Sequence, residues 1–581
     1  MTQYQINPYV SFVESRLFPE FVQRAMFHRL TGALVEPSDA IRSLVHAVKL
    51  GNRVSFTEAD LYQLGAVGNQ IRELITNEFL IPENYNPLTL LCEQYVARPI
   101  QNPALVYRSR AGEWILVRTS MEHTIYSRKE LPLVVEEALS PLTAEIFLMA
   151  DGSKTLREIF ATLRKGDGST VLEDSDFRTA IDFLTSQERQ LIKCTSRLED
   201  LEDPFRPVNI VPRNLYHAER WEQSSEGSRD KMIDFHLEGI QDAAWEFDQI
   251  EPTVNHCFRF PHEALGGLNY GSRFCVSALQ REYLPLLDRS NILNVLEVGG
   301  GTGAFARSFI EQAQQLSESL NINYHILDLS PALMESQRKI LSDLLPESRH
   351  FHQDATNFNI PGFQCDLVIA NEVVADFPVA LVKRAAVNAS GVPIDEKWEG
   401  DGAQYLAKYD LPHQGAPDSF FVNAGAFNFI ERAWKHLTPG GTLIVSEYGS
   451  QQIYPTRSAH LNHDEFSIHF GHLMACAAKI GFQCRLLTLK EFMSFDDEVL
   501  VLNGREEHIL CLNHVFKNFG VTLPYAVISK SEFAQHCAAI AEEIGLTGYS
   551  FSPLTKRYHY GPNMEDFLVL IMPKPFSSDQ K

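Results

Sequence analysis

The stretch Asn294-Val295-Leu296-Glu297-Val298-Gly299-Gly300-Gly301-Thr302-Gly303 decides the fold of the second half of the chain. It reads as an apolar strand that runs directly into a glycine-rich loop, and the following AFARSFIEQAQQL reads as a helix. Glycines allow a sharp turn with positive φ and leave bare backbone for a ligand to lie against. A strand, a glycine loop and a helix in this order predict the ligand-binding end of an open α/β sheet.

The loop by itself is compatible with two cofactors. The spacing Gly299-x-Gly301-x-x-Ala304 also fits a dinucleotide fingerprint, in which the helix N-terminus holds a pyrophosphate. Glu297, two residues before the first glycine, suits a cofactor that carries an ammonium and a sulfonium group, whereas a carboxylate is awkward beside a pyrophosphate. We therefore predict S-adenosyl-L-methionine, and a nicotinamide nucleotide is the alternative.

Polar residues at the ends of the following strands complete the predicted cofactor site. We expect Asp328 to accept hydrogen bonds from the ribose hydroxyls, and Asp354 to meet the adenine amino group. Arg273, in Tyr270–Phe274, would reach the cofactor carboxylate, unless it is an ordinary surface arginine. The expected cofactor-binding residues are Arg273, Glu297, Gly299, Gly300, Gly301, Gly303, Asp328, Asp354, Ala355 and Asn371.

Strand-like and helix-like segments alternate from about residue 255 onward, which predicts a mostly parallel sheet. The predicted fold class is therefore α/β, with a Rossmann-like methyltransferase domain over residues 255–581. Small winged-helix-like α+β modules are expected before it, over 1–95 and 100–195. Residues 196–254 are expected to form a linker and an entry helix.

The composition limits the partners and the compartment. A formal net charge of −23 argues against nucleic acid as a partner and suits a neutral or cationic acceptor. The nine cysteines form no CxxC pair, which is typical of reduced thiols. The sequence shows neither a signal peptide nor an apolar run of membrane-spanning length, so we expect a cytoplasmic protein that does not enter a membrane.

The two N-terminal regions share a pattern of helix, turn and capped helix. The expected capping boxes are Ser55-x-x-Glu58 and Thr155-x-x-Glu158. Residues 139–159, LSPLTAEIFLMADGSKTLREI, resemble the PqqD-type peptide-binding domain, and 28–34, HRLTGAL, resemble the opening of several peptide-maturation enzymes. The resemblance implies that a leader peptide binds as an added strand, with Ile146 and Phe147 beside its side chains. A module used for packing or dimerisation is the alternative.

Across residues 255–500 the order of motifs resembles the MidA family of protein methyltransferases. The resemblance rests on five blocks, which are 328–337 (DLSPALMESQ), 371–379 (NEVVADFPV), Trp398-Glu399, 440–449 (GGTLIVSEYG) and 467–469 (SIH). It implies that an arginine nitrogen is the default acceptor. Asp376 lies one position later than the family's acid, and Glu447 stands where the family has aspartate, so the acceptor can differ.

Three residues are the candidate catalytic groups. Glu372 follows the fourth strand and is the first candidate to hold the acceptor, followed by Asp376 and Tyr448. Helix capping is the alternative role for Asp376, and packing is the alternative for Tyr448. The two HxxH pairs (His460/His463 and His469/His472) invite a zinc hypothesis, but no cysteine joins them and methyl transfer needs no metal, so we expect none.

The sequence leaves three functions open. The first is a methyltransferase for a peptide or protein side chain, including a ribosomally made precursor whose leader binds the N-terminal modules. The second is a small-molecule methyltransferase of specialised metabolism. The third is a non-catalytic assembly factor that retains the fold. The oligomeric state, the acceptor atom and the number of methyl groups are not predicted.

Overall fold

The computed structural model of the chain describes residues 2–12, 26–31, 34–35, 37–49, 54–84, 95–99, 104–119, 134–165, 173–186, 189, 191–196, 237, 253–283, 292–317, 320–346, 349–385, 398–460, 463–502, 506–523, 527–554 and 567–576. The predicted linker and entry helix at 196–254 lie almost wholly outside these residues. Within the described part of the chain, no helix is long and apolar enough to cross a membrane.

The chain forms two compact units that are interleaved in sequence. The first unit comprises residues 1–226, 503–523 and 531–550, and the second comprises 227–502, 524–530 and 551–581. This grouping differs from the expectation that residues 255–581 form one domain, because two C-terminal stretches pack with the N-terminal region.

The second unit is built on one large, mostly parallel sheet. Its strand order is β14-β13-β12-β15-β19-β26-β23, and β22 pairs with the end of β19. β26 runs antiparallel to both of its neighbours, whereas β12 to β15 and β19 are parallel. The strands are β12 (Ile292–Val298), β13 (Asn321–Asp328), β14 (His350–His352), β15 (Cys365–Asn371), β19 (Leu437–Ser450), β22 (Ile468–His469), β23 (Arg485–Thr488) and β26 (Phe567–Pro573).

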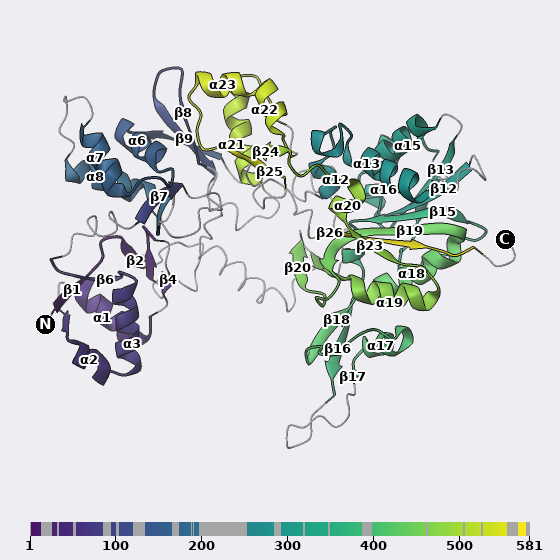
Figure 1. Cartoon of the computed structure of the whole chain (residues 1–581), viewed down its shortest axis with the longest axis horizontal. Helices are drawn as coiled ribbons and strands as arrows, with labels where there is room; N and C mark the ends of the chain where they lie inside the picture. Colours follow the sequence, from purple (N-terminus) through teal and green to yellow (C-terminus); the bar gives the residue numbers. More distant parts are fainter. Residues whose placement is uncertain are drawn as a thin grey trace. The chain divides into compact units, whose positions relative to one another are not determined.

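Helices cover both faces of this sheet, as the predicted α/β class requires (Figure 1). One layer contains α12 (Val254–Cys257), α13 (Tyr270–Val276), α15 (Ala304–Leu316), α16 (Pro331–Ile340) and α20 (Leu489–Met493). The other contains α18 (Ala424–His436) and α19 (Phe470–Ile480), which pack on β19. The core between the sheet and the layer of α18 and α19 includes Leu296, Val298, Val368, Leu443 and Phe427, all buried.

The sheet reverses its direction of growth between β12 and β15. From β12 the chain moves outward through β13 and β14, and it then returns to form β15 on the opposite side of β12. Val298 is paired with Ala370, so the loops that follow β12 and β15 lie side by side. Ligands of open α/β sheets bind outside the carboxyl ends of strands at such a reversal, so this point positions the candidate site.

Smaller elements lie at the carboxyl side of β15 and β19. A three-stranded sheet, β17-β16-β18, contains β16 (Ala380–Arg384), β17 (Trp398–Glu399) and β18 (Ser419–Val422), with α17 (Ala403–Tyr409) beside it (Figure 1). The hairpin β20 (Arg457–His460) and β21 (His463–Phe466) contacts the short 3₁₀ helix η7 (Val374–Asp376). The remaining pair in this unit is β24 (Leu500–Leu502) with β25 (Phe551–Pro553).

The first unit begins with two small sheets and three helices. One sheet has the order β5-β1-β6, from β1 (Thr2–Ile6), β5 (Val54–Phe56) and β6 (Leu80–Pro82). The other is β2 (Val10–Phe12), β3 (Met26–His28) and β4 (Leu34–Val35). The helices are α1 (Asp39–Lys49), α2 (Glu58–Gln63) and α3 (Ala66–Thr76). The capping box predicted at Ser55 is wrong by two residues, because Thr57 caps α2 together with Asp60.

The region that resembles a PqqD-type domain is a three-stranded antiparallel sheet followed by three helices. The sheet has the order β10-β9-β8, from β8 (Ala104–Arg108), β9 (Trp114–Thr119) and β10 (Val134–Leu139). The helices are α6 (Pro141–Met149), α7 (Leu156–Lys165) and α8 (Asp174–Leu184), and β11 (Ile192–Ser196) pairs with β7 (Tyr95–Pro99). The capping box at Thr155 and Glu158 is confirmed by reciprocal hydrogen bonds.

The HRLTG segment joins these two regions into one body. Leu30 and Tyr9 are buried in the same core as Leu116 and Ile181, and the Cys194 amide donates to the Leu30 carbonyl at 2.7 Å. Arg29 is ion-paired with Asp182. The segment therefore has a packing role within the first unit.

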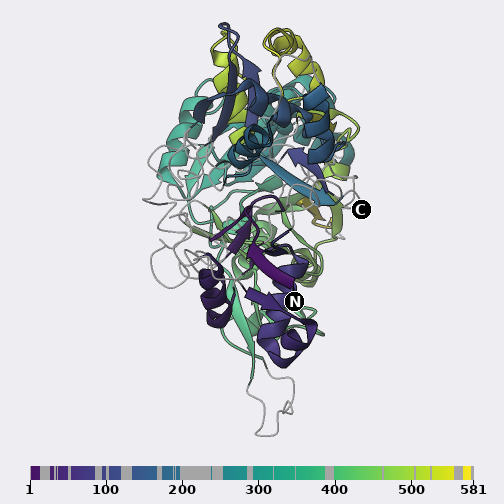
Figure 2. The ribbon, with the colours of Figure 1, turned by 90° about the vertical axis from the view of Figure 1, so that its left-hand side faces the viewer.

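The C-terminal helix α21 (Glu506–Lys517) packs against β8, β9 and β10. The helices α22 (Lys530–His536) and α23 (Ala538–Glu543) lie near it (Figures 1 and 2). Residues 544–547 form backbone hydrogen bonds with β8, including both bonds between Val106 and Thr547. One edge of the β10-β9-β8 sheet is thus covered by chain from the C-terminal half. This long-range pairing has no local sequence signal.

Candidate functional site

The glycine loop after β12 has the predicted positive φ angles, but its glycines have different roles. Gly299 has φ +69°, and a Cβ placed there would lie 2.4 Å from Val373 Cγ2. Gly301 has φ +50°, and no heavy atom of the described residues lies within 4 Å of the position of its Cβ. Gly299 is therefore required by protein packing against the neighbouring loop, whereas Gly301 borders open space.

Asp328 lies at the end of β13, beside the glycine loop, and is buried. Its carboxylate accepts hydrogen bonds from the Gly300 amide at 3.1 Å and the Ser330 amide at 2.9 Å. Gln337 Nε2 also donates to it, at 2.7 Å. The sequence predicted the position of Asp328 beside the loop but not the part of Gln337, whose contact comes from the far end of α16.

Glu297 is buried within β12, where its carboxylate accepts a hydrogen bond from the Tyr324 hydroxyl at 3.0 Å. Burial raises the pKa of Glu297 to about 8, and the nearby charge of Asp328 acts in the same direction. A positively charged ligand group at this end of the sheet would favour the ionised form. The predicted pairing of Glu297 with a cofactor ammonium group is compatible with this electrostatic setting.

Asp354 and Ala355, which were predicted to lie near the adenine, have contacts within the protein. Asp354 accepts hydrogen bonds from the backbone and the hydroxyl of Thr356, both at 2.8 Å. The side chain of Ala355 is buried in the core under the sheet. Asp354 therefore shapes a turn in the structure, and contact of Ala355 with a cofactor would use its backbone.

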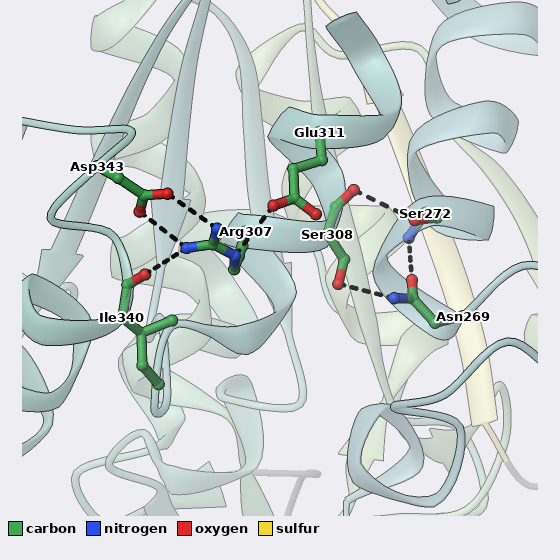
Figure 3. A network of polar contacts seen from close by, with 7 residues as sticks. All are labelled: Asn269, Ser272, Arg307, Ser308, Glu311, Ile340 and Asp343. Atoms are coloured by element: carbon green, nitrogen blue, oxygen red, sulfur yellow. Dashed lines mark hydrogen bonds and ion pairs between the residues drawn. The ribbon is translucent and has the colours of Figure 1, made fainter. Parts of the chain in front are cut away.

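Helix α13 is fixed firmly to α15, as Figure 3 shows. Asn269 donates to Ser308 Oγ at 3.0 Å and caps α13 through the Ser272 amide, while Arg307 binds Asp343 and Glu311. A Cβ at Gly271 would lie 2.8 Å from the Phe305 carbonyl oxygen, so the glycine permits this close approach.

The fixed helix α13 places Tyr270 and Arg273. The Tyr270 hydroxyl donates to Asn371 Oδ1 at 2.7 Å, which links the helix to the end of β15. Arg273 Nε donates to the carbonyl of Met493, at the end of α20. The contact described for Arg273 is thus with protein backbone, and its predicted contact with a cofactor carboxylate stays a prediction.

Glu372, the first catalytic candidate, follows β15 with an unusual φ of +51°. Its carboxylate accepts hydrogen bonds from the backbone amides of Val254 at 2.8 Å and Asn255 at 3.3 Å, at the start of α12. Burial raises the pKa of Glu372 to about 7, although these two hydrogen bonds act in the opposite direction. Glu372 therefore holds α12 against the end of β15.

Glu447 is a buried acid at the end of β19 that was noted in the sequence only as a departure from the family pattern. It accepts hydrogen bonds from the amides of Val374 at 3.0 Å and Ala375 at 3.1 Å. Burial raises the pKa of Glu447, and the charges of Glu372 and Glu465 raise it further. Glu447 thus fixes the loop after β15, and no local signal in the sequence indicated that contact.

The two other catalytic candidates, Asp376 and Tyr448, respectively follow β15 and lie near the end of β19, at the same carboxyl edge as Glu372. Asp376 is the last residue of η7 and is partly buried. Tyr448 follows Glu447 and is 48% exposed, with its ring edge-on to Phe567 at 5.9 Å. Of the three candidates, Tyr448 has the greatest freedom to meet a ligand.

The histidines of the HxxH pairs are separated into two places. His460 is paired with His463 across the β20–β21 hairpin, whereas the rings of His469 and His472 are stacked 3.8 Å apart next to Tyr454. Burial lowers the pKa of His469 and of His472 to about 4. Within the ranges that the structure describes, no group of three or more His, Cys, Asp or Glu side chains is arranged to hold a metal.

The arrangement fits S-adenosylmethionine. The glycine loop, in which Gly301 borders open space, follows β12 at the reversal point of the sheet, and acids lie at the ends of β12 and β13. Acidic groups suit the cofactor's ammonium, sulfonium and ribose hydroxyls, and would repel a pyrophosphate. Contact of Glu297 and Asp328 with the cofactor stays a prediction.

The comparisons with known proteins agree with this assignment. Residues 275–464 match a family model described as "Putative S-adenosyl-L-methionine-dependent methyltransferase". No curated protein matches the sequence.

Several solved structures are similar to parts of the chain. One is a protein from Burkholderia thailandensis bound to S-adenosylhomocysteine, with 17% identity over 63% of this chain and 93% of that one, and a TM-score of 0.31. Another is an S-adenosylmethionine-dependent methyltransferase from Clostridium acetobutylicum, with 12% identity over 38% and 82% of the two chains and a TM-score of 0.23. At TM-scores below 0.5 these similarities carry no functional argument. The family match and the site together identify the second unit as an S-adenosylmethionine-dependent methyltransferase domain.

Proposed function

We propose that this chain transfers a methyl group to a nitrogen atom of a peptide or protein side chain. The observation that carries the proposal is a group of acids at the carboxyl edge of the sheet, namely Glu372 and Glu447 with Glu465 near both. Burial raises the pKa of Glu372 and of Glu447, and the charge of Glu465 adds to each shift; the charge of Glu372 also raises the pKa of Glu447. A guanidinium or ammonium group close to these carboxylates would offset their mutual repulsion.

The reaction is an in-line displacement that depends mainly on alignment. Bound S-adenosylmethionine supplies the methyl group on a sulfonium. The residues of the chain orient the acceptor and accept its proton: Asp376 and Tyr448 are proposed to contact the acceptor. Glu372 is proposed to act by positioning, because its carboxylate already binds the backbone of α12.

The first unit is proposed to recognise an extended peptide, including the leader of a ribosomally made precursor. β8 is already paired on its outer side with residues 544–547, whereas in the described residues β10 is paired only with β9. An edge strand with free backbone groups can accept a further strand. Ile146 and Phe147 are themselves buried in the core, so the expected pockets beside them would be lined by their neighbours, and they stay a prediction.

The test is methylation of peptide arrays by the full-length protein, with labelled S-adenosylmethionine and product detection by mass spectrometry. We expect a gain of one or more methyl units on peptides with arginine or lysine, and no gain on matched peptides with glutamine in their place. Methylation of small molecules alone would support specialised metabolism, and cofactor binding without turnover would support an assembly factor. Either result would contradict the proposal.

A further inference from the structure

We propose that Gln337 is a positioning residue for the cofactor, whose amide nitrogen holds Asp328 in the orientation that binds the ribose hydroxyls. This inference rests on the proposed ribose role of Asp328. Gln337 belongs neither to the glycine loop nor to a strand end, so neither of these motifs assigns it a role.

The geometry of Gln337 is that of a bridge between the two halves of the cofactor site. Nε2 donates to Asp328 Oδ2 at 2.7 Å and to the Gly301 carbonyl at 2.9 Å. One amide group therefore ties the end of β13 to the glycine that borders open space. The hydrogen bond to the ionised carboxylate is of the charge-assisted kind, which is the stronger kind.

The orientation of the amide is fixed by its neighbours. Exchange of the amide oxygen and nitrogen would place the oxygen against two other oxygens, so the donating assignment is the consistent one. In this orientation Gln337 Oε1 is buried and has no hydrogen-bond partner among the described residues. A buried acceptor without a partner is unfavourable, so a residue chosen only for packing would be apolar. The two donated bonds are what an apolar side chain cannot supply.

Two loop glycines make room for Gln337. A Cβ at Gly303 would lie 3.0 Å from Gln337 Cα, and one at Gly300 would lie 3.1 Å from Nε2. A Cβ at Gly300 would also lie 2.7 Å from Ile326 Cγ2 on β13. The bare backbone of both glycines thus permits the close approach of Gln337 that brings its amide to Asp328, and their predicted contact with the cofactor stays a prediction.

The experiment measures binding of S-adenosylhomocysteine to the full-length protein by calorimetry. Gln337→Met keeps the length of the side chain and removes the donor, and we expect it to weaken binding by about tenfold or more. The second probe is an analogue of S-adenosylhomocysteine that lacks the 2′ and 3′ hydroxyls. If Gln337 acts through Asp328 on the ribose, the variant and the wild type bind this analogue within about twofold of each other.

Gln312→Met is the matched control, because Gln312 is also a buried glutamine and lies on the adjacent helix α15. We expect it to leave both affinities unchanged. Thermal unfolding without ligand checks that each variant folds.

The outcomes separate this proposal from the proposed function. Equal losses for both probes would mean that Gln337 only supports the loop, and unchanged binding of S-adenosylhomocysteine would mean that it has no positioning role. Either result would overturn the proposal while the methyltransferase assignment stands. Failure of the wild-type protein to bind S-adenosylhomocysteine at all would overturn both.

Discussion

The two halves of the sheet's carboxyl edge use similar residues for different purposes. At the ends of β12 and β13, Glu297 and Asp328 are buried; Asp328 binds the glycine loop, in which Gly301 borders open space. At the ends of β15 and β19, Glu372 and Glu447 accept backbone hydrogen bonds that hold α12 and η7. Asp328 also accepts two backbone amides, from Gly300 and Ser330, so all three of these acids hold backbone. The difference is in what they hold: Asp328 holds the glycine loop, where we predict that it meets the cofactor, whereas Glu372 and Glu447 hold α12 and η7.

The comparison is tested most severely at Gly301. Gly301→Val would fill the open space with a branched side chain, and we expect a loss of S-adenosylmethionine affinity of at least about 100-fold, which corresponds to about 2.7 kcal/mol. Calorimetry measures the affinity. Gly267→Val is the control, since Gly267 also has positive φ (+79°) and no heavy atom of the described residues near its Cβ position. Equal losses in both variants would show that backbone strain, and not space for a ligand, is the cause.

At Gly299, by contrast, we expect a substitution to reduce stability. Gly299→Ala introduces a Cβ 2.4 Å from Val373 at positive φ, so we expect the free energy of unfolding to fall by about 2–4 kcal/mol. Urea denaturation, followed through the unfolding transition of the second unit, measures this free energy. Adding Val373→Ala should restore part of the loss by removing the clash. A full loss in the double variant would mean that strain alone is responsible.

The raised pKa of Glu297 predicts that the free energy of unfolding depends on pH. Its pKa is raised to about 8, so between about pH 4.5 and 8 the folded protein binds more protons than the unfolded chain. Stability of the cofactor-free protein should therefore fall as the pH rises through this range, by at most about 1.4 kcal/mol per pH unit from this group. Glu297→Gln should remove that share of the slope in denaturation curves. The control Glu311→Gln, in α15, should leave the slope unchanged. An identical slope in the wild type and both variants would contradict the raised pKa of Glu297.

The smallest effect is expected at Tyr448. Because the ring is 48% exposed and Tyr448→Phe removes only a hydroxyl, the free energy of unfolding should change by less than about 0.5 kcal/mol. If the hydroxyl contacts the acceptor, kcat should fall by about tenfold while cofactor affinity is unchanged. Steady-state kinetics with a methylated peptide identified in the array gives both values. Unchanged kcat would assign Tyr448 a packing role.

The cofactor half of the site was largely predictable because its signals are local. The strand, the glycine loop and the acids at strand ends follow one another within short stretches, and Asp328 and Gly301 lie where the pattern placed them. In the half proposed to bind the acceptor, the sequence placed the acids at strand ends but not their contacts. That Glu372 binds the amides of α12 depends on residues more than 100 positions away in the chain. No periodicity or spacing encodes such a contact.

The sequence by itself determined the α/β class, the glycine loop and the capping of helices such as α7, because each depends on neighbouring residues and on backbone conformations that few residue types adopt. Only the tertiary structure decided that residues 503–523 and 531–550 pack with the first unit, that Gln337 reaches Asp328, and that Gly299 makes room for Val373. The physical reason is that buried surfaces and backbone groups find partners through packing, which joins distant segments irrespective of their separation in the chain.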